Sequence, residues 1–396
     1  MNRARVLQEI RIMRFEEIYQ WQSERKLTNE EAAEMLGVCE RTYRRWCRRY
    51  EEEGITGLLD GRLEKAAHNC APVDEVIEVI SLYETHYINF SVSHFYDKYR
   101  DSHKGQRSYT WVKSRLQEAG FVRKAKKRGA HRRKRERRPL KGMMLHQDAS
   151  KHEWVEGQDW DLVVTMDDAD NEIYSAFFVD EEGTRSSFQG VQEVIENHGL
   201  FCSLYTDRGT HYWTTKKAGG KVESEELTQF GRAMQQLGIE MIAAYSPEAR
   251  GRSERMFRTL QGRLPKELAL SGITNKEDAN RYMAEIFLPS FNARFKVKAE
   301  ELITSFVPWL DSHLRLKEIL CIQTQRVVKK DNTVSYGSRI LQIERNGKRY
   351  SYAKAKVRVH EYANGELAIF YGHCCLGRYD GEGKSLNEEK KERAAA

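Results

Sequence analysis

Apolar residues near the start of the chain recur with the period of an α-helix. A first helix is predicted from Ala4 to Lys26, and Thr28 and Glu31 form a capping box that begins a second helix. Gly37 supplies the turn to a third helix, predicted from Glu40 to Glu53. The apolar residues of this third helix lie at i, i+3, i+4 and i+7: Tyr43, Trp46, Cys47 and Tyr50. Residues 1–60 are therefore predicted to form a helix-turn-helix domain, whose third helix suits the major groove.

The helical period returns after a loop that ends at Pro72. Three more helices are predicted, over Val73–Tyr87, Ser91–Tyr99 and Tyr109–Ala119. In the last of them the apolar residues face inward and the basic residues face outward. Residues 61–122 are therefore expected to form either a second helix-turn-helix unit that contacts DNA or a helical spacer that does not.

The pattern changes to that of short strands in the region from residue 141 to residue 312. Strands are predicted over Met143–Ser150, Trp160–Met166 and Ile173–Val179, then from Phe201 and over Ile239–Tyr245. A helix from Thr184 to Asn197 separates the third strand from the fourth. Alternation of strands with helices predicts an α/β domain built on one mixed five-stranded sheet.

Three of these predicted elements each carry one acidic residue. Asp148 stands near the end of the first strand, and Asp207 follows the fourth strand, where Gly209 opens a turn. Glu254 stands at the start of a basic helix predicted from Gly251. A single carboxylate among arginines is ordinarily a salt-bridged surface residue. The two upstream acids make Glu254 a candidate for chemistry instead.

These residues resemble the motifs of the DDE transposases and retroviral integrases over about residues 145–266. The matching features are Asp148, the Thr206-Asp207-Arg208-Gly209 turn, and Tyr245-Ser246-Pro247 ahead of Gly251-Arg252-Ser253-Glu254-Arg255. The resemblance implies an RNase H-like catalytic core in which Asp148, Asp207 and Glu254 are the catalytic residues and metal ligands. The spacing from Asp207 to Glu254 exceeds that of the most compact members. The polar stretch Thr214–Thr228 is therefore predicted to be an inserted surface loop.

The resemblance also implies the cofactor. Carboxylate oxygens are the ligands that Mg²⁺ prefers, so two Mg²⁺ ions, or Mn²⁺ ions, are expected in each active site. Asp148 would be shared by both ions, with Asp207 on one and Glu254 on the other. His146 is expected to be a buried histidine. Five further acids are expected to cap turns: Asp159, Asp161, Asp167, Asp168 and Asp170.

The net charge of +7 is concentrated in a few segments. Arg123–Arg138 holds eleven Lys or Arg residues against one Glu, which predicts a basic linker, residues 123–140, that contacts nucleic acid. A merely solvated linker is the alternative. The expected contacts to double-stranded DNA are Arg41, Arg44, Arg45, Arg48, Arg49, Lys113, Arg115, Arg132, Arg133, Arg135, Arg252, Arg255 and Arg258. Arg258 is the best candidate to hold a phosphate beside the metal site.

Beyond residue 312 the chain again alternates with the period of strands. Asn346-Gly347 and Asn364-Gly365 are strong hairpin turns between such runs. Residues 313–380 are therefore predicted to form a linker and a small β-barrel, similar to the SH3-like domain that follows the catalytic core in related enzymes. The predicted strands are Arg326–Lys330, Asp331–Tyr336, Ile340–Glu344, Arg349–Tyr352, Lys356–His360 and Ala368–Tyr371. Residues 381–396 are expected to be a disordered tail.

Composition narrows the class of protein. Seven cysteines follow no zinc-ligand spacing, which favours a reducing compartment. No apolar run reaches membrane length, and no Walker A pattern occurs. A cytoplasmic, nucleoid-associated protein with neither a membrane partner nor a nucleotide cofactor is expected.

The resemblance implies a transposase that binds the terminal inverted repeats of its own insertion sequence. It would cleave the 3′ ends and transfer the strands to target DNA, as a homodimer or higher multimer on paired ends. One alternative is a domesticated transposase that has lost its chemistry and acts as a DNA-binding regulator. Another is a structure-selective RNase H-like nuclease. The three acids argue against the first alternative, and the two helical units against the second.

Overall fold

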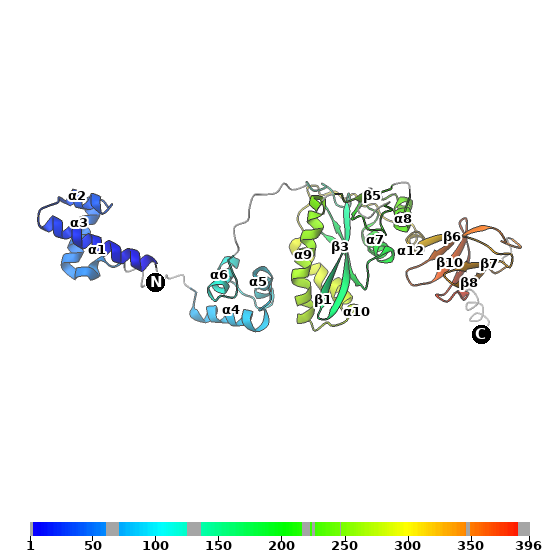
Figure 1. Cartoon of the computed structure of the whole chain (residues 1–396), viewed down its shortest axis with the longest axis horizontal. Helices are drawn as coiled ribbons and strands as arrows, with labels where there is room; N and C mark the ends of the chain where they lie inside the picture. Colours follow the sequence, from blue (N-terminus) through cyan, green and yellow to red (C-terminus); the bar gives the residue numbers. More distant parts are fainter. Residues whose placement is uncertain are drawn as a thin grey trace. The chain divides into compact units, whose positions relative to one another are not determined.

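The computed structural model describes residues 3–60, 71–124, 136–215, 222–223, 226–245, 247–345 and 349–386 (Figure 1). By their internal contacts they belong to two compact units. The first comprises residues 1–88 and 110–122, and the second comprises residues 89–109 and 123–396. Each unit is described by itself.

The first unit begins with the predicted helix-turn-helix domain. Its helices are α1 (Arg3–Ser23), α2 (Asn29–Met35) and α3 (Glu40–Glu53), followed by the 3₁₀ turn η1 (Gly54–Leu58). The capping box is present, because the Glu31 N–H donates to Thr28 Oγ1 at 3.2 Å and the Thr28 N–H donates to Glu31 Oε2 at 2.8 Å. The three helices enclose an aromatic and aliphatic core: Phe15, Ile18, Ala32, Ala33 and Tyr43. The prediction of this domain is confirmed.

Two more helices belong to the first unit, α4 (Val73–His86) and most of α6 (Tyr109–Glu118). Their inward residues are buried: Val79, Tyr83, Val112 and Leu116. The ring of Tyr83 lies 5.7 Å from the ring of Phe121, just beyond α6. The helix between them, α5 (Val92–Asp101), belongs to the second unit. All three predicted helices are present, and their contact with DNA stays a prediction.

A five-stranded mixed sheet forms the centre of the second unit (Figure 1). Its strands are β1 (Leu145–Val155), β2 (Gln158–Asp167), β3 (Ile173–Val179), β4 (Ser203–Thr206) and β5 (Glu240–Ala243). They lie in the order β3-β2-β1-β4-β5. The first three strands of the chain pair antiparallel, whereas β1, β4 and β5 run parallel. The prediction of a mixed five-stranded sheet is confirmed.

Helices pack on both faces of this sheet. On one face lie α9 (Pro247–Leu270), α10 (Lys276–Tyr282), the π-helical turn η2 (Met283–Phe287) and α11 (Leu288–Phe295). On the other face lie α7 (Thr184–His198), α8 (Gln229–Leu237) and α12 (His313–Ile319). Each face buries its own apolar core, so the sheet is the middle layer of three.

Two predicted boundaries on the α9 face are wrong. Helix α9 begins at Pro247, before the predicted Gly251, because proline is well accommodated in the first helical turn. The segment Phe291–Phe295, whose sequence predicts a turn-like exit after the preceding helix, is helical instead. Phe287, Phe291 and Phe295 recur every four residues and stack with ring centroids 5.6 and 4.6 Å apart, which continues the helix.

A network of ion pairs fixes α5 to the C-terminal half of α9. Glu267 Oε1 lies 2.7 Å from His94 Nε2, and Glu267 Oε2 lies 2.6 Å from Lys98 Nζ. Arg263 Nη1 lies 2.7 Å from Asp97 Oδ2, which also receives Arg294 of α11. The buried part of this network ties a segment predicted to belong with the N-terminal helices to the sheet domain.

The C-terminal part, predicted to contain a small β-barrel, forms two sheets. Strands β6 (Ile322–Val327), β9 (Lys356–Glu361), β10 (Leu367–Tyr371) and β11 (Cys374–Tyr379) lie in the order β11-β10-β9-β6, and β7 (Thr333–Tyr336) pairs with β8 (Arg339–Gln342). No closed sheet occurs among the described strands, so the barrel is not confirmed. The hairpin at Asn364-Gly365 is confirmed by a φ of 82° at Gly365.

Other expectations for this part need correction or fall outside the structure. Residues 349–352 do not form a strand, and β11 was not expected because a bulge beside Phe370 interrupts its alternation. The turn Asn346-Gly347 and most of the C-terminal tail lie outside the described residues. Among the described helices, none combines the length and the apolar character needed to cross a membrane.

Replacing Glu267 with Gln should destabilise the protein in a pH-dependent way. Burial opposes ionisation of Glu267, but hydrogen bonds from His94 and Lys98 outweigh it and lower the pKa of Glu267 to about 2. A lowered carboxyl pKa stabilises the fold above the unfolded pKa, so the substitution should cost about 3 kcal/mol at pH 7. The cost should shrink as the pH falls below 4.5 toward 2.

Thermal unfolding of the full chain between pH 3 and pH 7 measures this difference. Glu285→Gln is the matched control, because Glu285 is exposed on the adjacent η2 turn. An equal loss in both variants, or a loss that does not change with pH, would contradict the proposed role of Glu267.

Candidate active site

Asp148 lies on the side of β1 that faces α9. Side chains alternate along a strand, so Asp148 shares its face with His146 and Ser150. The amide of Gln261 on α9 donates to Ser150 Oγ at 2.9 Å, which identifies this face. Asp148 is half-buried, and its Oδ1 accepts the Ala149 N–H at 3.1 Å. It stands inside an eleven-residue strand rather than near the strand's end as predicted, because β1 continues to Val155 in its long pairing with β2.

The parallel pairing of β1 with β4 brings Asp207 beside Asp148. Leu145 pairs with Leu204, and His146 pairs with Tyr205. Continuing this register by two residues sets Asp148 opposite Asp207, which directly follows β4. Neighbouring strands are about 4.8 Å apart, and residues in register point to the same face. Both carboxylates therefore belong on the α9 side of the sheet.

The turn after Asp207 depends on a glycine. Asp207 Oδ1 accepts the Gly209 N–H at 2.8 Å. A Cβ added to Gly209 would lie 3.0 Å from Asp207 Oδ1 and 3.0 Å from Cε1 of His211. Such contacts are tighter than ordinary packing, so a side chain at this position would have to displace the Asp207 carboxylate or the His211 ring.

The negative charges of both acids act on a buried tyrosine. Burial raises the pKa of Tyr212 well above its usual value, and the negative charges of Glu182, Asp148 and Asp207 raise it further. Its hydroxyl donates to Gln147 Oε1 at 3.1 Å and accepts from Ser187 Oγ at 3.1 Å. Tyr212 was not singled out in the sequence. Its position five residues after Asp207 is the signal that could have found it.

Glu254 lies on α9 at the level of Asp148. Near the start of α9, Arg252 contacts the carboxyl group that also binds His146, and further along Gln261 contacts Ser150. Helix α9 therefore runs beside β1 in the same direction, and Glu254 and Asp148 lie between the same two contacts. Glu254 is the eighth residue of α9 rather than its start, and its side chain is exposed while Ser253 and Phe257 are buried.

The donor chemistry of these three acids fits a hard divalent cation. Carboxylate oxygens are the ligands that Mg²⁺ and Mn²⁺ accept, and Asp148 and Asp207 share a register. Across the described ranges, no three His, Cys, Asp or Glu side chains form a cluster that could hold a metal ion as they stand. An exposed glutamate exchanges rotamers within nanoseconds, so Glu254 can turn toward the aspartates.

The acids of the β2–β3 turn have protein partners. Asp167 accepts the N–H groups of Gly142 and Ala169, both at 2.8 Å, and its burial raises its pKa to about 6. Asp170 lies 3.1 Å from Lys141 Nζ. Arg137, from the basic segment, donates to the carbonyl groups of Asp168 and Ala169. These contacts agree with the expectation that the turn acids bind backbone groups.

Asp168 is the turn acid that contacts both β1 and α9. Its Oδ1 binds His146 Nε2 at 2.8 Å and the Arg252 guanidinium, and its Oδ2 accepts the Arg138 N–H at 2.8 Å. Burial opposes ionisation, but these donors outweigh it and hold the pKa of Asp168 below its usual value. His146 is buried, as expected. Sequence reasoning assigned Asp168 to turn capping and missed its contacts with β1 and α9.

The described residues among those predicted to contact DNA lie on three helices. Those on α3 are all exposed: Arg41, Arg44, Arg45, Arg48 and Arg49. On α9, Arg255 and Arg258 are exposed, whereas Arg252 forms an ion pair with Asp168. On α6, Lys113 and Arg115 are half-buried, and Arg115 pairs with Glu118 at 2.8 Å. The remaining three lie outside the described residues: Arg132, Arg133 and Arg135.

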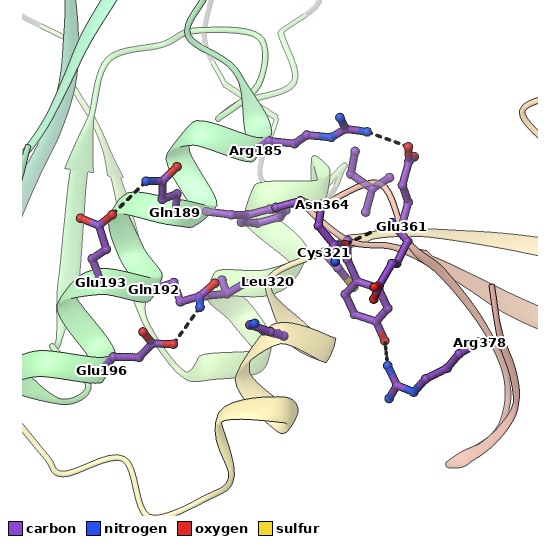
Figure 2. Close-up of a pocket in the computed structure, with 16 residues that line it drawn as sticks. Arg185, Gln189, Gln192, Glu193, Glu196, Leu320, Cys321, Glu361, Asn364 and Arg378 are labelled. Carbon is purple, nitrogen blue, oxygen red and sulfur yellow. Dashed lines mark hydrogen bonds and ion pairs between the residues drawn. The ribbon is translucent and has the colours of Figure 1, made fainter. Parts of the chain in front are cut away.

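A cavity elsewhere in the second unit contains none of the predicted site residues. Residues of α7, of α12 and of the β9–β10 hairpin line it (Figure 2). At its rim Arg185 pairs with Glu361 at 2.6 Å, and Arg378 lies against Tyr362 (Figure 2). Its lining mixes acidic, basic and amide groups and shows no preference for one class of ligand.

Comparison with known proteins adds evidence from sequence. The model of the homeodomain-like domain family matches residues 3–59. A protein of Sinorhizobium fredii named "Putative transposase y4bF" is 28% identical over 355 residues, covering 88% of this chain and 76% of the relative. The transposase for insertion sequence IS1202 of Streptococcus pneumoniae is 29% identical over 236 residues, covering 59% of this chain and 50% of the relative.

Among solved structures, the HTLV-2 integrase catalytic core in complex with magnesium is 15% identical, with a TM-score of 0.31 over 41% of this chain and 93% of that one. A simian T-cell lymphotropic virus intasome bound to PP2A regulatory subunit B56 gamma gives a TM-score of 0.35 at 15% identity, over 68% and 88%. These scores are low, and the sequence relatives carry the assignment. They cover most of the chain, and the N-terminal domain is homeodomain-like. In sequence, the chain is therefore similar to two proteins named as transposases, one of them the transposase of an insertion sequence, and its N-terminal domain is similar to homeodomain-like domains.

Proposed function

We propose that this protein is a transposase of the DDE type, with Asp148, Asp207 and Glu254 as its catalytic residues. It would bind the terminal inverted repeats of its insertion sequence, cleave their 3′ ends and transfer the strands to target DNA. The observation that carries the proposal is the register of β1 and β4, which sets Asp148 opposite Asp207. The course of α9 beside β1 supports Glu254 as the third acid.

The three acids would hold two divalent ions, Mg²⁺ or Mn²⁺. Bound there, the metal supplies activation of the attacking oxygen and neutralisation of charge on the leaving oxygen. Asp148, on the central strand, is the acid suited to be shared, with Asp207 and Glu254 on either side. Without a cation, three carboxylates repel a DNA phosphate. Cleavage should therefore require a divalent metal.

Basic side chains would hold the DNA across this site. Arg255 and Arg258 are exposed and lie one and four residues after Glu254. A basic residue at this spacing suits a phosphate of the strand that is cut. The five exposed arginines of α3 would contact the terminal repeat in the major groove. One chain holds one set of acids and an element has two ends, so a homodimer or higher multimer would process paired ends.

Replacing any one of the three acids should abolish catalysis without loss of DNA binding. Asp148→Asn, Asp207→Asn and Glu254→Gln should each slow Mg²⁺-dependent nicking of labelled end DNA by more than about a hundredfold, because a metal ligand is lost. Denaturing gels measure the nicking, and gel shifts measure the binding. EDTA should stop the wild-type reaction.

Asp159→Asn is the matched control, since Asp159 is exposed on β2 opposite Glu153, away from Asp148. It should retain wild-type activity. Nicking that survives in Glu254→Gln, or in excess EDTA, would reject the DDE assignment. A wild-type chain that binds ends but never cuts them would favour a DNA-binding regulator.

The exposed arginines of α3 should account for salt-dependent binding to the element's ends. Replacing Arg45 and Arg48 with Ala should weaken binding and lower the slope of log K against log salt by about 1 for each lost phosphate contact. Fluorescence anisotropy at several salt concentrations measures both quantities. Replacing Arg11 and Arg14 with Ala removes the same charge from exposed positions on α1 and should have a smaller effect. Equal losses from both helices would mean that α3 is not the reading helix.

A further inference from the structure

A shared spacing links the three candidate acids to one polar cluster. Two residues before Asp148 stands His146, two before Asp207 stands Tyr205, and two before Glu254 stands Arg252. Asp168 of the β2–β3 turn binds His146 and Arg252, and the ring of Tyr205 lies 5.0 Å from the ring of His146. These four residues, Asp168, His146, Tyr205 and Arg252, are called the Asp168 cluster below.

The cluster joins every element that carries an acid. Asp168 is fully buried, and its Oδ1 accepts from His146 Nε2 on β1 at 2.8 Å and from the Arg252 guanidinium on α9. Its Oδ2 accepts the Arg138 N–H at 2.8 Å, so the carboxyl group cannot rotate without losing a donor. Tyr205, on β4, is in register with His146 and packs against its ring.

The contacts of the Asp168 cluster also restrict the positions of the three acids, because each acid is only two residues from a member of the cluster. Residues i and i+2 of a strand point to the same face about 7 Å apart, so holding His146 holds Asp148, and holding Tyr205 holds Asp207. Arg252 and Glu254 stand in the same turn of α9, so the contact of Arg252 with Asp168 sets how far α9 slides or rotates against β1. The carboxyl group of Asp168 therefore influences the relative positions of all three acids.

We propose that Asp168 is a positioning residue for the active site. It holds the strand that carries Asp148 and the helix that carries Glu254 at the separation needed to bind metal. This inference rests on the proposed function of the three acids. It adds a residue that contacts neither the DNA nor the ions but sets the affinity of the site for the cation.

Asparagine is the informative replacement, because it keeps the shape of the side chain and cannot accept at both oxygen positions. If its amide nitrogen replaces Oδ1, it opposes His146 and Arg252. If the nitrogen replaces Oδ2, it opposes the Arg138 N–H. In the first orientation the bonds that hold β1 and α9 to the turn are lost, and in the second the bond from the Arg138 N–H is lost. In both orientations the negative charge that pairs with Arg252 is removed, which weakens the contact with α9.

Asp170→Asn is the matched control. Asp170 is equally buried in the same turn, but its oxygens face the Glu172 N–H, at 2.9 Å, and Lys141 Nζ, at 3.1 Å. It touches neither His146 nor Arg252. A purely structural role for the turn acids would give the two variants the same behaviour once both have folded.

The test measures metal binding without DNA and then cleavage. Mn²⁺ titrated into the full-length chain, followed by electron paramagnetic resonance, gives the dissociation constant. Asp168→Asn should weaken Mn²⁺ binding by about tenfold or more and lower the nicking rate by about 10- to 100-fold. The affinity of Asp168→Asn for end DNA should stay within about twofold of the wild-type affinity. The substitution should therefore lower kcat and leave KM for DNA unchanged. Asp170→Asn should change the melting temperature but not the Mn²⁺ affinity.

Arg252 provides a second series if Asp168→Asn does not fold. Its side chain is 14% exposed and is not part of the apolar cluster between α9 and the sheet, so its replacement removes the contact with Asp168 without removing an apolar contact of that cluster. Arg252→Ala should weaken Mn²⁺ binding in the same way, and Arg252→Lys should restore part of it because the cation beside Asp168 is kept. Mn²⁺ affinity is read without DNA, so any loss of a phosphate contact does not affect it.

The outcomes separate this inference from the proposed function. Wild-type Mn²⁺ affinity and nicking in a folded Asp168→Asn or Arg252→Ala variant would overturn the positioning role alone. The same loss of affinity in Asp170→Asn would also overturn it. The proposed function, and this inference with it, would be overturned by two results together. One is that Asp148→Asn binds Mn²⁺ as tightly as the wild-type chain, and the other is that the wild-type chain never nicks end DNA.

Discussion

The parallel pairing of β1 with β4 is the constraint on which the candidate site depends. Leu145 opposite Leu204 and His146 opposite Tyr205 fix a register that sets Asp148 opposite Asp207, although 58 residues of chain lie between the two acids. A slip of one residue would turn one of the acids to the other face of the sheet. The residues that pair just ahead of the two acids therefore determine where these acids lie relative to one another.

Side chains alternate along β1, so its two faces carry different kinds of residue. Leu145 and Gln147 face α7, where the Gln147 amide donates to the Ser187 carbonyl and to Thr165 Oγ1, both at 3.1 Å. His146, Asp148 and Ser150 face α9. One face of the strand thus builds the apolar core with α7 and α8, and the other carries polar groups toward the helix that bears Glu254.

The candidate basic residues of α3 and the candidate acids also lie in different parts of the chain. The exposed arginines of α3 stand on a small domain whose fold depends on its own aromatic core. Asp148 and Asp207 belong to the sheet and Glu254 to α9, and the helices α9 and α11 are tied to α5 by the ion pairs of Glu267, Arg263 and Arg294. The proposed DNA contacts of α3 and the proposed catalytic acids can therefore be altered by separate substitutions.

The sequence by itself determined the features that depend on neighbouring residues. The capping box of α2, the bounds of α3 and β3, the hairpin at Asn364-Gly365 and the order of strands and helices all follow from local propensity and period. The family motifs likewise selected Asp148, Asp207 and Glu254. Only the tertiary structure decided that Asp168 binds both His146 and Arg252, that α5 joins the sheet domain, and that the C-terminal strands form two open sheets. These are contacts between residues far apart in the chain, and no local pattern encodes which partners meet when the core closes.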